Sequence, residues 1–116
     1  MIDQFEITSN VSKRIFLCNI LKFENGYFIS ISEEKLRIKS ISVSLATSNQ
    51  TNTAKVIQDK YDQLFIDTLS RRISLMINGI CIISFFTKNK LQFEDMRTIN
   101  DKILKTIEDN KNGNRD

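Results

Sequence analysis

The sequence predicts an α+β domain, in which an antiparallel β-sheet of about five to six strands is combined with two helices. Three observations lead to this fold class. The first half of the chain consists of short runs rich in β-branched and aromatic residues, separated by polar turns. Two later segments repeat apolar residues every three or four positions, which is the period of an amphipathic helix. One further apolar run lies between those two segments, so the predicted order is ββββ-α-β-α.

The four strands of the first half follow from their composition and from the turns between them. Their predicted ranges are residues 5–9, 14–23, 27–32 and 36–47. Asn25 and Gly26 separate the second run from the third, and Asn-Gly is a strong hairpin signal because both residues tolerate a positive φ angle. A polar turn at residues 33–35 separates the third run from the fourth. The opening half is therefore predicted to be a β-meander, in which each strand pairs with the next.

The first helix is predicted over residues 54–77, where apolar residues recur at helical spacing. It follows a polar connector at residues 48–53, in which Asn52 or Thr53 is the expected N-cap because both side chains can accept a hydrogen bond from the first helical turn. Gly79 comes directly after the helix. It is expected to be the left-handed residue that ends it.

The remaining elements are a strand at residues 80–86 and a helix at residues 92–109. The strand is almost entirely apolar, and the helix has one apolar face. Residues 110–116 are polar and terminal, and they are predicted to form a disordered tail. Residues 1–109 are therefore expected to form a single α+β domain.

The strands at residues 14–23 and 80–86 are apolar on both faces. A sheet with one face in water alternates apolar and polar residues, so these two strands are predicted to be covered on both sides. Two helices on one side leave the other side for a folded-over sheet or for another subunit, and both arrangements fit. The candidate contacts with a partner share one face: Phe16, Cys18, Ile20, Ile83 and Phe85. The opposite set of side chains in the same strands is the alternative.

The long strand at residues 36–47 alternates between aliphatic and serine side chains. The aliphatic residues are expected to face inward, and the serines are expected to face outward on a small, flat surface. The two sets are Ile41, Val43 and Leu45, and Ser40, Ser42 and Ser44. This pattern predicts a rim or a closely packed contact on the serine side.

The composition disfavours an enzyme. The chain of 116 residues has no histidine, which removes the usual base for serine and cysteine nucleophiles and a common metal ligand. Its three glycines lie too far apart for a phosphate-binding loop. Acidic pairs such as Glu33-Glu34 and Glu94-Asp95 are expected to face solvent, as acids in turns and in first helical turns commonly do. No catalytic residue, cofactor or metal ligand is therefore predicted.

The net charge of +3, with basic residues scattered along the chain, argues against a nucleic-acid partner. Cys18 and Cys81 lie in apolar runs, where they are expected to be free thiols that pack as small hydrophobes. No run approaches the roughly 20 apolar residues needed to span a bilayer. The first residues also lack the pattern of a signal peptide. The expected location is therefore the cytoplasm, with the nucleus as a second compartment, and no membrane partner is expected.

Four stretches carry a family resemblance: EITSNVSKRIFLCNILKF, the strand end VSLA, the junction NGICIISFF and the closing FEDMRTINDKILKTIEDN. Together they resemble the small eukaryotic proteasome-assembly chaperones, the fourth member of that group more than the third. The resemblance implies a non-enzymatic chaperone that pairs as a heterodimer with a second small chaperone subunit through its sheet. It also implies binding to α subunits of the 20S proteasome while the α ring assembles. In such a pair, the helices cover one side of the sheet and the partner's sheet covers the other.

Two other kinds of protein provide the alternatives. A trafficking or signalling scaffold of the longin, roadblock or profilin type also combines a small antiparallel sheet with helices, but its elements generally follow a different order. A small RNA-binding α+β domain needs polar and basic positions on its open sheet, where this chain has apolar residues. Binding to other proteins is therefore expected ahead of binding to nucleic acid.

Overall fold

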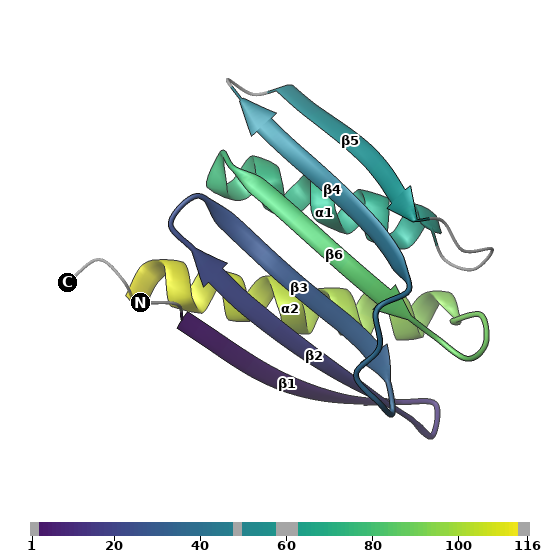
Figure 1. Ribbon diagram of the computed structural model, residues 1–116. Coiled ribbons are helices and arrows are strands. Elements are labelled where there is room, and N and C mark those ends of the chain that lie inside the picture. Colours follow the sequence, from purple (N-terminus) through teal and green to yellow (C-terminus); the bar gives the residue numbers. More distant parts are fainter. Residues whose placement is uncertain (1–2, 48–49, 58–62, 114–116) are drawn as a thin grey trace.

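The computed structural model describes residues 3–47, 50–57 and 63–113. These residues form one six-stranded sheet with two helices on one side of it, which confirms the predicted α+β class (Figure 1). The elements in chain order are β1 (Asp3–Val11), β2 (Arg14–Phe23), β3 (Gly26–Glu33), β4 (Ser40–Thr47), β5 (Gln50–Ile57), α1 (Gln63–Ile77), β6 (Ile80–Phe86) and α2 (Phe93–Gly113).

The strand order in the sheet is β1-β2-β3-β6-β4-β5. Neighbouring strands are antiparallel, except that β3 and β6 are parallel. The predicted meander therefore holds for β1, β2 and β3 but is wrong for β4, because β6 lies between β3 and β4. The composition of β6 explains this place: a strand that is apolar on both faces is best accommodated in the interior of a sheet.

The segment at residues 50–57, which was expected to be a connector and the start of a helix, is strand β5. It pairs antiparallel with β4, with Thr53 opposite Ser44. Asn52 and Thr53 are therefore strand residues, and the predicted N-cap is wrong. Pairing along β4 satisfies the backbone groups of the segment that face β4, and β-branched threonine suits a strand. In the described residues, the helix α1 spans Gln63–Ile77, and residues 58–62 of the predicted helix lie outside the described residues.

The helix α2 ends at Gly113, beyond the predicted end at residue 109. Residues 110–113 of the predicted tail therefore continue the helix, and residues 114–116 lie outside the described residues. A local hydrogen bond supports the extension, because the Asn110 side-chain amide donates to the carbonyl of Thr106 at 2.8 Å. The polar residues 110–113 are therefore part of the helix.

Left-handed backbone conformations occur at residues other than the predicted ones. Ser12 and Lys13 both have a positive φ and form the two-residue turn between β1 and β2, as in a type I′ hairpin. Asn78, and not Gly79, has the positive φ that ends α1. Asparagine tolerates this conformation better than most residues. Glycine is required at position 79 because a Cβ atom there would lie 2.5 Å from the backbone oxygen of Asn25.

The serines of β4 face the helices, so the predicted inward and outward sides of this strand are reversed. Ser42 and Ser44 are fully buried beneath α1, where their hydroxyl oxygens lie 3.2 Å and 2.7 Å from that of Ser70. Small side chains let the helix lie close to the strand, and the hydrogen bonds among the hydroxyls offset the cost of burying them. Ile41 and Val43 consequently face the other side of the sheet.

The hydrophobic core lies between the sheet and the two helices. Each helix contributes fully buried aliphatic residues at spacings of three and four, which places them on one face. These residues are Ile66, Leu69 and Ile73 of α1, and Ile99, Ile103 and Ile107 of α2. One side of the sheet is thereby covered within the chain.

Candidate protein-binding face

The side of the sheet opposite the helices, which we call the open face, is largely apolar. Figure 1 shows this side toward the viewer, with both helices behind the sheet. Strands β2, β3, β4 and β6 each contribute aliphatic or aromatic side chains that are half-buried or exposed. These residues are Ile15, Leu17, Leu21, Phe23, Phe28, Ile41, Val43, Leu45, Ile80 and Ile82. In the strand register, Leu21, Phe28, Ile82 and Val43 are neighbours across the four strands, whereas a row of Asn19, Ser30 and Ser84 separates them from Ile15 and Leu17. A contiguous apolar row of this kind is typical of a protein–protein interface.

The five residues predicted as partner contacts lie on the other side of the sheet, toward the helices. Phe16, Cys18, Ile20, Ile83 and Phe85 are each at most 2% exposed and belong to the hydrophobic core. Both helices pack on this side, so these side chains make their contacts within the chain. The alternative set, on the open face, is therefore the surface that a partner can reach. Burial also raises the pKa of the Cys18 and Cys81 thiols to about 12, so both remain protonated.

Residues 34–39, which we call the strap, cross one end of the open face. In the sheet, β6 lies between β3 and β4, so the chain must cross β6 on its way from β3 to β4 (Figure 1). The strap is held by the Ser32 hydroxyl, which donates to the carbonyl of Lys35 and accepts from the amide of Arg37 at 3.0 Å. The Arg37 guanidinium lies 5.1 Å from the ring centre of Phe86, a cation–π contact on the open face.

The strap carries two of the most exposed aliphatic side chains in the described residues. Leu36 is 60% exposed and Ile38 is 67% exposed. Both residues are held above the sheet, because the strap rests on Ser32 and Phe86. Exposing two branched aliphatic side chains to water on a short, anchored segment is unfavourable unless another surface covers them. The strap is therefore a raised apolar edge of the open face.

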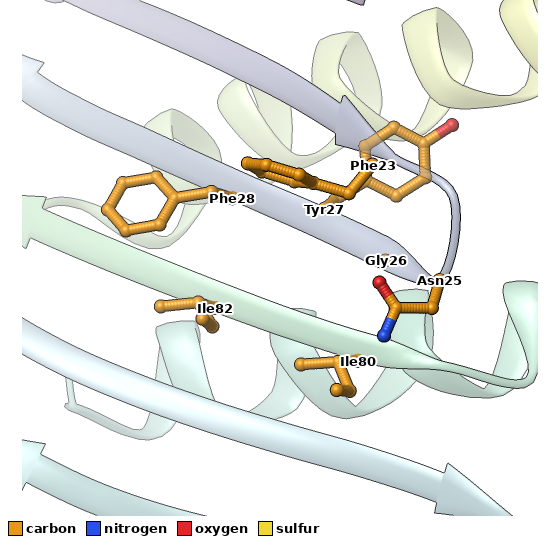
Figure 2. Close-up of a pocket in the computed structure, with 7 residues that line it drawn as sticks. All are labelled: Phe23, Asn25, Gly26, Tyr27, Phe28, Ile80 and Ile82. Atoms are coloured by element: carbon orange, nitrogen blue, oxygen red, sulfur yellow. The ribbon is translucent and has the colours of Figure 1, made fainter. Parts of the chain in front are cut away.

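A hollow with a volume of about 260 Å³ lies toward the opposite end of the open face. It is located where β2 ends and where β3 and β6 begin, and Figure 2 shows the side chains around it. Its walls are mostly apolar, and none of its lining residues is charged. The lining residues are Phe23, Asn25, Gly26, Tyr27, Phe28, Ile80 and Ile82. This hollow can accommodate apolar side chains of a partner.

A second shallow hollow lies between the strap and the edge strand β1. Gln4, Asn19 and Ser30 give it uncharged polar groups, and Leu21 and Phe28 give it apolar walls.

Within residues 3–47, 50–57 and 63–113, no three acidic or cysteine side chains come together as a metal site would require. In the same ranges, no helix has the length and apolar character needed to cross a membrane.

A buried ion pair fixes the start of the strap, and sequence reasoning did not anticipate it. Glu33 was expected to face solvent but is only 5% exposed. The Arg14 guanidinium donates to both of its carboxylate oxygens, at 2.7 Å and 3.1 Å, and the amide of Lys88 donates at 2.9 Å. The hydrogen bonds from Arg14 are the main cause of the lowered pKa of Glu33. The sequence did contain one signal for the burial of Glu33. Glu33 lies two positions after Ile31 in β3, so both side chains point to the same face of the strand, and Ile31 is buried.

We expect Arg14→Ala to lower the free energy of unfolding by about 2 kcal/mol at pH 7, because it leaves the Glu33 carboxylate buried without its cation. The loss should be smaller than for a fully buried ion pair, because Arg14 is partly exposed to water. The pKa of Glu33 is lowered by folding, so its contribution is present above its ordinary pKa of 4.5 and is lost as the pH falls through the lower folded value. Urea unfolding of wild type and variant at pH 7 and near pH 3 measures this. Lys13→Ala, at an exposed turn residue, is the control. An equal gap between wild type and Arg14→Ala at both pH values would contradict the assignment.

No family model matches the sequence, and no curated protein matches it either. Among solved structures, the chain is similar to one of a chaperone complex for yeast 20S proteasome assembly. The similarity covers 89% of this chain and 97% of that chain, with a TM-score of 0.65 and 13% sequence identity. At this level of identity, the two chains share a fold.

Proposed function

We propose that this protein is a non-enzymatic assembly chaperone that pairs with a related small subunit through its open face and binds α subunits of the 20S proteasome while the α ring assembles. The observation that carries the proposal is the apolar open face, on a fold shared with a chain of the yeast chaperone complex. The proposal includes a cytoplasmic location, which suits the two free, buried cysteines.

The distribution of side chains supports a protein partner for the open face. Soluble monomers rarely leave a large contiguous apolar patch in water, and such patches usually mark interaction sites. A second sheet packed face to face, about 10 Å away, would bury the open face as the helices bury the other face. The same chain would then have two covered sheet faces, as the apolar strands β2 and β6 require.

The open face is a poor surface for RNA. Sheets that bind RNA present aromatic side chains interleaved with basic ones, so that bases stack and phosphates are neutralised. Here Phe23 and Phe28 lie among aliphatic neighbours such as Leu21 and Ile82. Arg37 is the one basic residue that lines either hollow, and its guanidinium contacts the ring of Phe86. This arrangement favours an apolar protein surface as the ligand.

The test is to purify the tagged protein from its native cells and identify the proteins that copurify. We expect wild type to recover proteasome α subunits together with a second small chain. Val43→Asp, which places a charge on the open face, should lose the second chain, because an unpaired carboxylate would be buried in the interface. Leu75→Asp is the matched control, since Leu75 is an exposed apolar residue on α1 in the helix layer. Recovery of small GTPases or RNA without proteasome subunits would overturn the proposal.

A further inference from the structure

We infer that the side chain of Lys102 protects the outer edge of β1 against the addition of another strand, and that without it β1 pairs with β1 of a second copy of this chain. The inference concerns the backbone edge of the sheet, whereas the proposed function uses the open face, so each can fail without the other. An edge strand is a hazard to a soluble protein, because its outer backbone groups can pair with any extended chain.

The strand β1 offers a long and regular edge for such pairing. It is the first strand in the order of the sheet, and its nine residues, Asp3–Val11, pair with β2 without a register shift. Natural proteins commonly interrupt an edge of this kind with a proline or a bulge. The chain has no proline, and the pairing of β1 with β2 has no bulge.

The strand β5, at the other end of the sheet order, is irregular. Ile41 and Ser42 of β4 are consecutive, whereas their partners Ile57 and Lys55 are separated by one residue, so β5 bulges at that point. A bulge increases the twist of a strand and interrupts its row of backbone groups. Of these two strands, β1 is therefore the one that needs another form of protection.

The backbone groups of Thr8 point away from β2. The turn between β1 and β2 has two residues, so Val11 and Arg14, which flank it, form a hydrogen-bonded pair. Hydrogen-bonded and non-hydrogen-bonded pairs alternate along an antiparallel ladder, and Thr8 falls in a non-hydrogen-bonded pair. Glu6 and Asn10 share this phase. The N–H and C=O groups of all three residues therefore form the outer edge of β1.

The side chain of Lys102 occupies this outer row near its middle. Lys102 lies on α2, which packs against β1, and its Nζ donates a hydrogen bond to the carbonyl oxygen of Thr8 at 3.1 Å. Burial raises the pKa of the Cys18 thiol, and the positive charge of Lys102 opposes that rise. Cys18 lies opposite Ile7 in the register, so both interactions place the ammonium beside β1. A strand added at this edge would displace the ammonium from Thr8, and lysine is a common protector of edge strands.

A second copy of β1 fits the edge that Lys102 occupies. In an antiparallel pair with Thr8 opposite Thr8 of the other copy, the two threonines can exchange both backbone hydrogen bonds, as their outward groups require. Phe5 then lies opposite Val11, and Glu6 lies opposite Asn10, so the acidic side chains do not face each other. Pairs of threonines and pairs of apolar side chains stabilise neighbouring strands. One two-fold axis through the threonine pair generates the whole contact.

The experiment compares wild type with Lys102→Met, which keeps an unbranched side chain of good helix propensity on α2 and removes the charge. Lys105→Met makes the same change at another exposed position of the helix and is the matched control. Amide hydrogen exchange is followed by NMR at low and high protein concentration. In Lys102→Met at high concentration, the amides of Glu6, Thr8 and Asn10 should exchange at least about tenfold more slowly than in wild type, because the added strand bonds them.

Sedimentation velocity of the same samples should show larger species in Lys102→Met than in wild type or Lys105→Met. Lys102→Arg keeps a cation and a donor, so it should behave as wild type. Pairing through the open face leaves the outer amides of β1 in water, so their exchange reports on the edge alone. Equal association of Lys102→Met and Lys105→Met would show that net charge, and not the contact with Thr8, controls association, and it would overturn the inference.

A second substitution tests the edge itself. Thr8→Pro removes an outward N–H and no hydrogen bond to β2, and proline is tolerated in an edge strand where the N–H faces solvent. Added to Lys102→Met, it should restore the sedimentation of wild type. Association that survives Thr8→Pro would place the contact elsewhere and overturn the inference. If the double variant does not fold, exchange in Lys102→Met decides: amides of Glu6, Thr8 and Asn10 that exchange as fast as in wild type at every concentration would equally overturn it.

Discussion

Replacing Ile83 with aspartate should unfold the protein, whereas the same substitution at the neighbouring Ile82 should leave it folded. Ile83 is 0% exposed and belongs to the core beneath the helices. The substitution removes a buried branched side chain and places a carboxylate without a partner in an apolar environment. The combined loss, more than about 5 kcal/mol, is comparable to the whole stability of a domain of this size. Far-UV circular dichroism and a thermal melt should show an unfolded or barely folded chain.

Ile82 is the matched control because it differs from Ile83 only in the face of β6 that it occupies. Its side chain lines the hollow of the open face and is half-buried (Figure 2). Aspartate there keeps its contact with water in the monomer, so a melting temperature within a few degrees of wild type is expected. In a pair, that carboxylate would be buried, and dimers or copurified partners should be lost. If Ile82→Asp unfolds the chain as severely as Ile83→Asp, the open face is not a free surface.

The strands with the strongest composition were predictable from the sequence alone. β2 and β6 have the bounds that their runs of β-branched and aromatic residues predict. β5 was missed because its polar residues resemble a connector. The segment is a strand because it pairs with the edge of β4, and this pairing is not visible in its own sequence. The order of strands was missed for a related reason: local patterns do not contain the long-range pairing of β3 with β6.

The candidate site was predictable as a pair of faces but not as one face. Alternation in β2 and β6 shows that both faces of these strands are apolar, but it does not indicate on which face the helices pack. The residues of β4 identify that face, because Ser42 and Ser44 are small and are buried against α1. The sequence pattern had predicted the opposite, with the serines on the outer face. The strap could not be predicted from local patterns, because it depends on the strand order. The chain crosses the open face because β6 lies between β3 and β4.

Gly26→Ala should destabilise the protein by about 3 kcal/mol, even though it adds a single methyl group to a turn. A Cβ atom at Gly26 would lie well inside 3.0 Å of the backbone carbonyl oxygen of Ile80, a separation that real Cβ atoms do not show. The neighbour is backbone and cannot rotate away. It belongs to the junction where the Ile80 amide donates to the Asn25 carbonyl at 3.0 Å, so relieving the clash would move β6 against β3.

Asn25→Ala, in the same turn, is the control for Gly26→Ala, because only the backbone oxygen of Asn25 takes part in the junction. At about 4 °C per kcal/mol for a domain of this length, Gly26→Ala should melt about 12 °C below wild type, and Asn25→Ala should melt within a few degrees of it. The clash involves the start of β6, which lies in the middle of the sheet, so the loss should appear as lower stability of the whole domain in urea as well. A Gly26→Ala variant as stable as wild type would mean that β3 and β6 do not approach each other as closely as this fold requires.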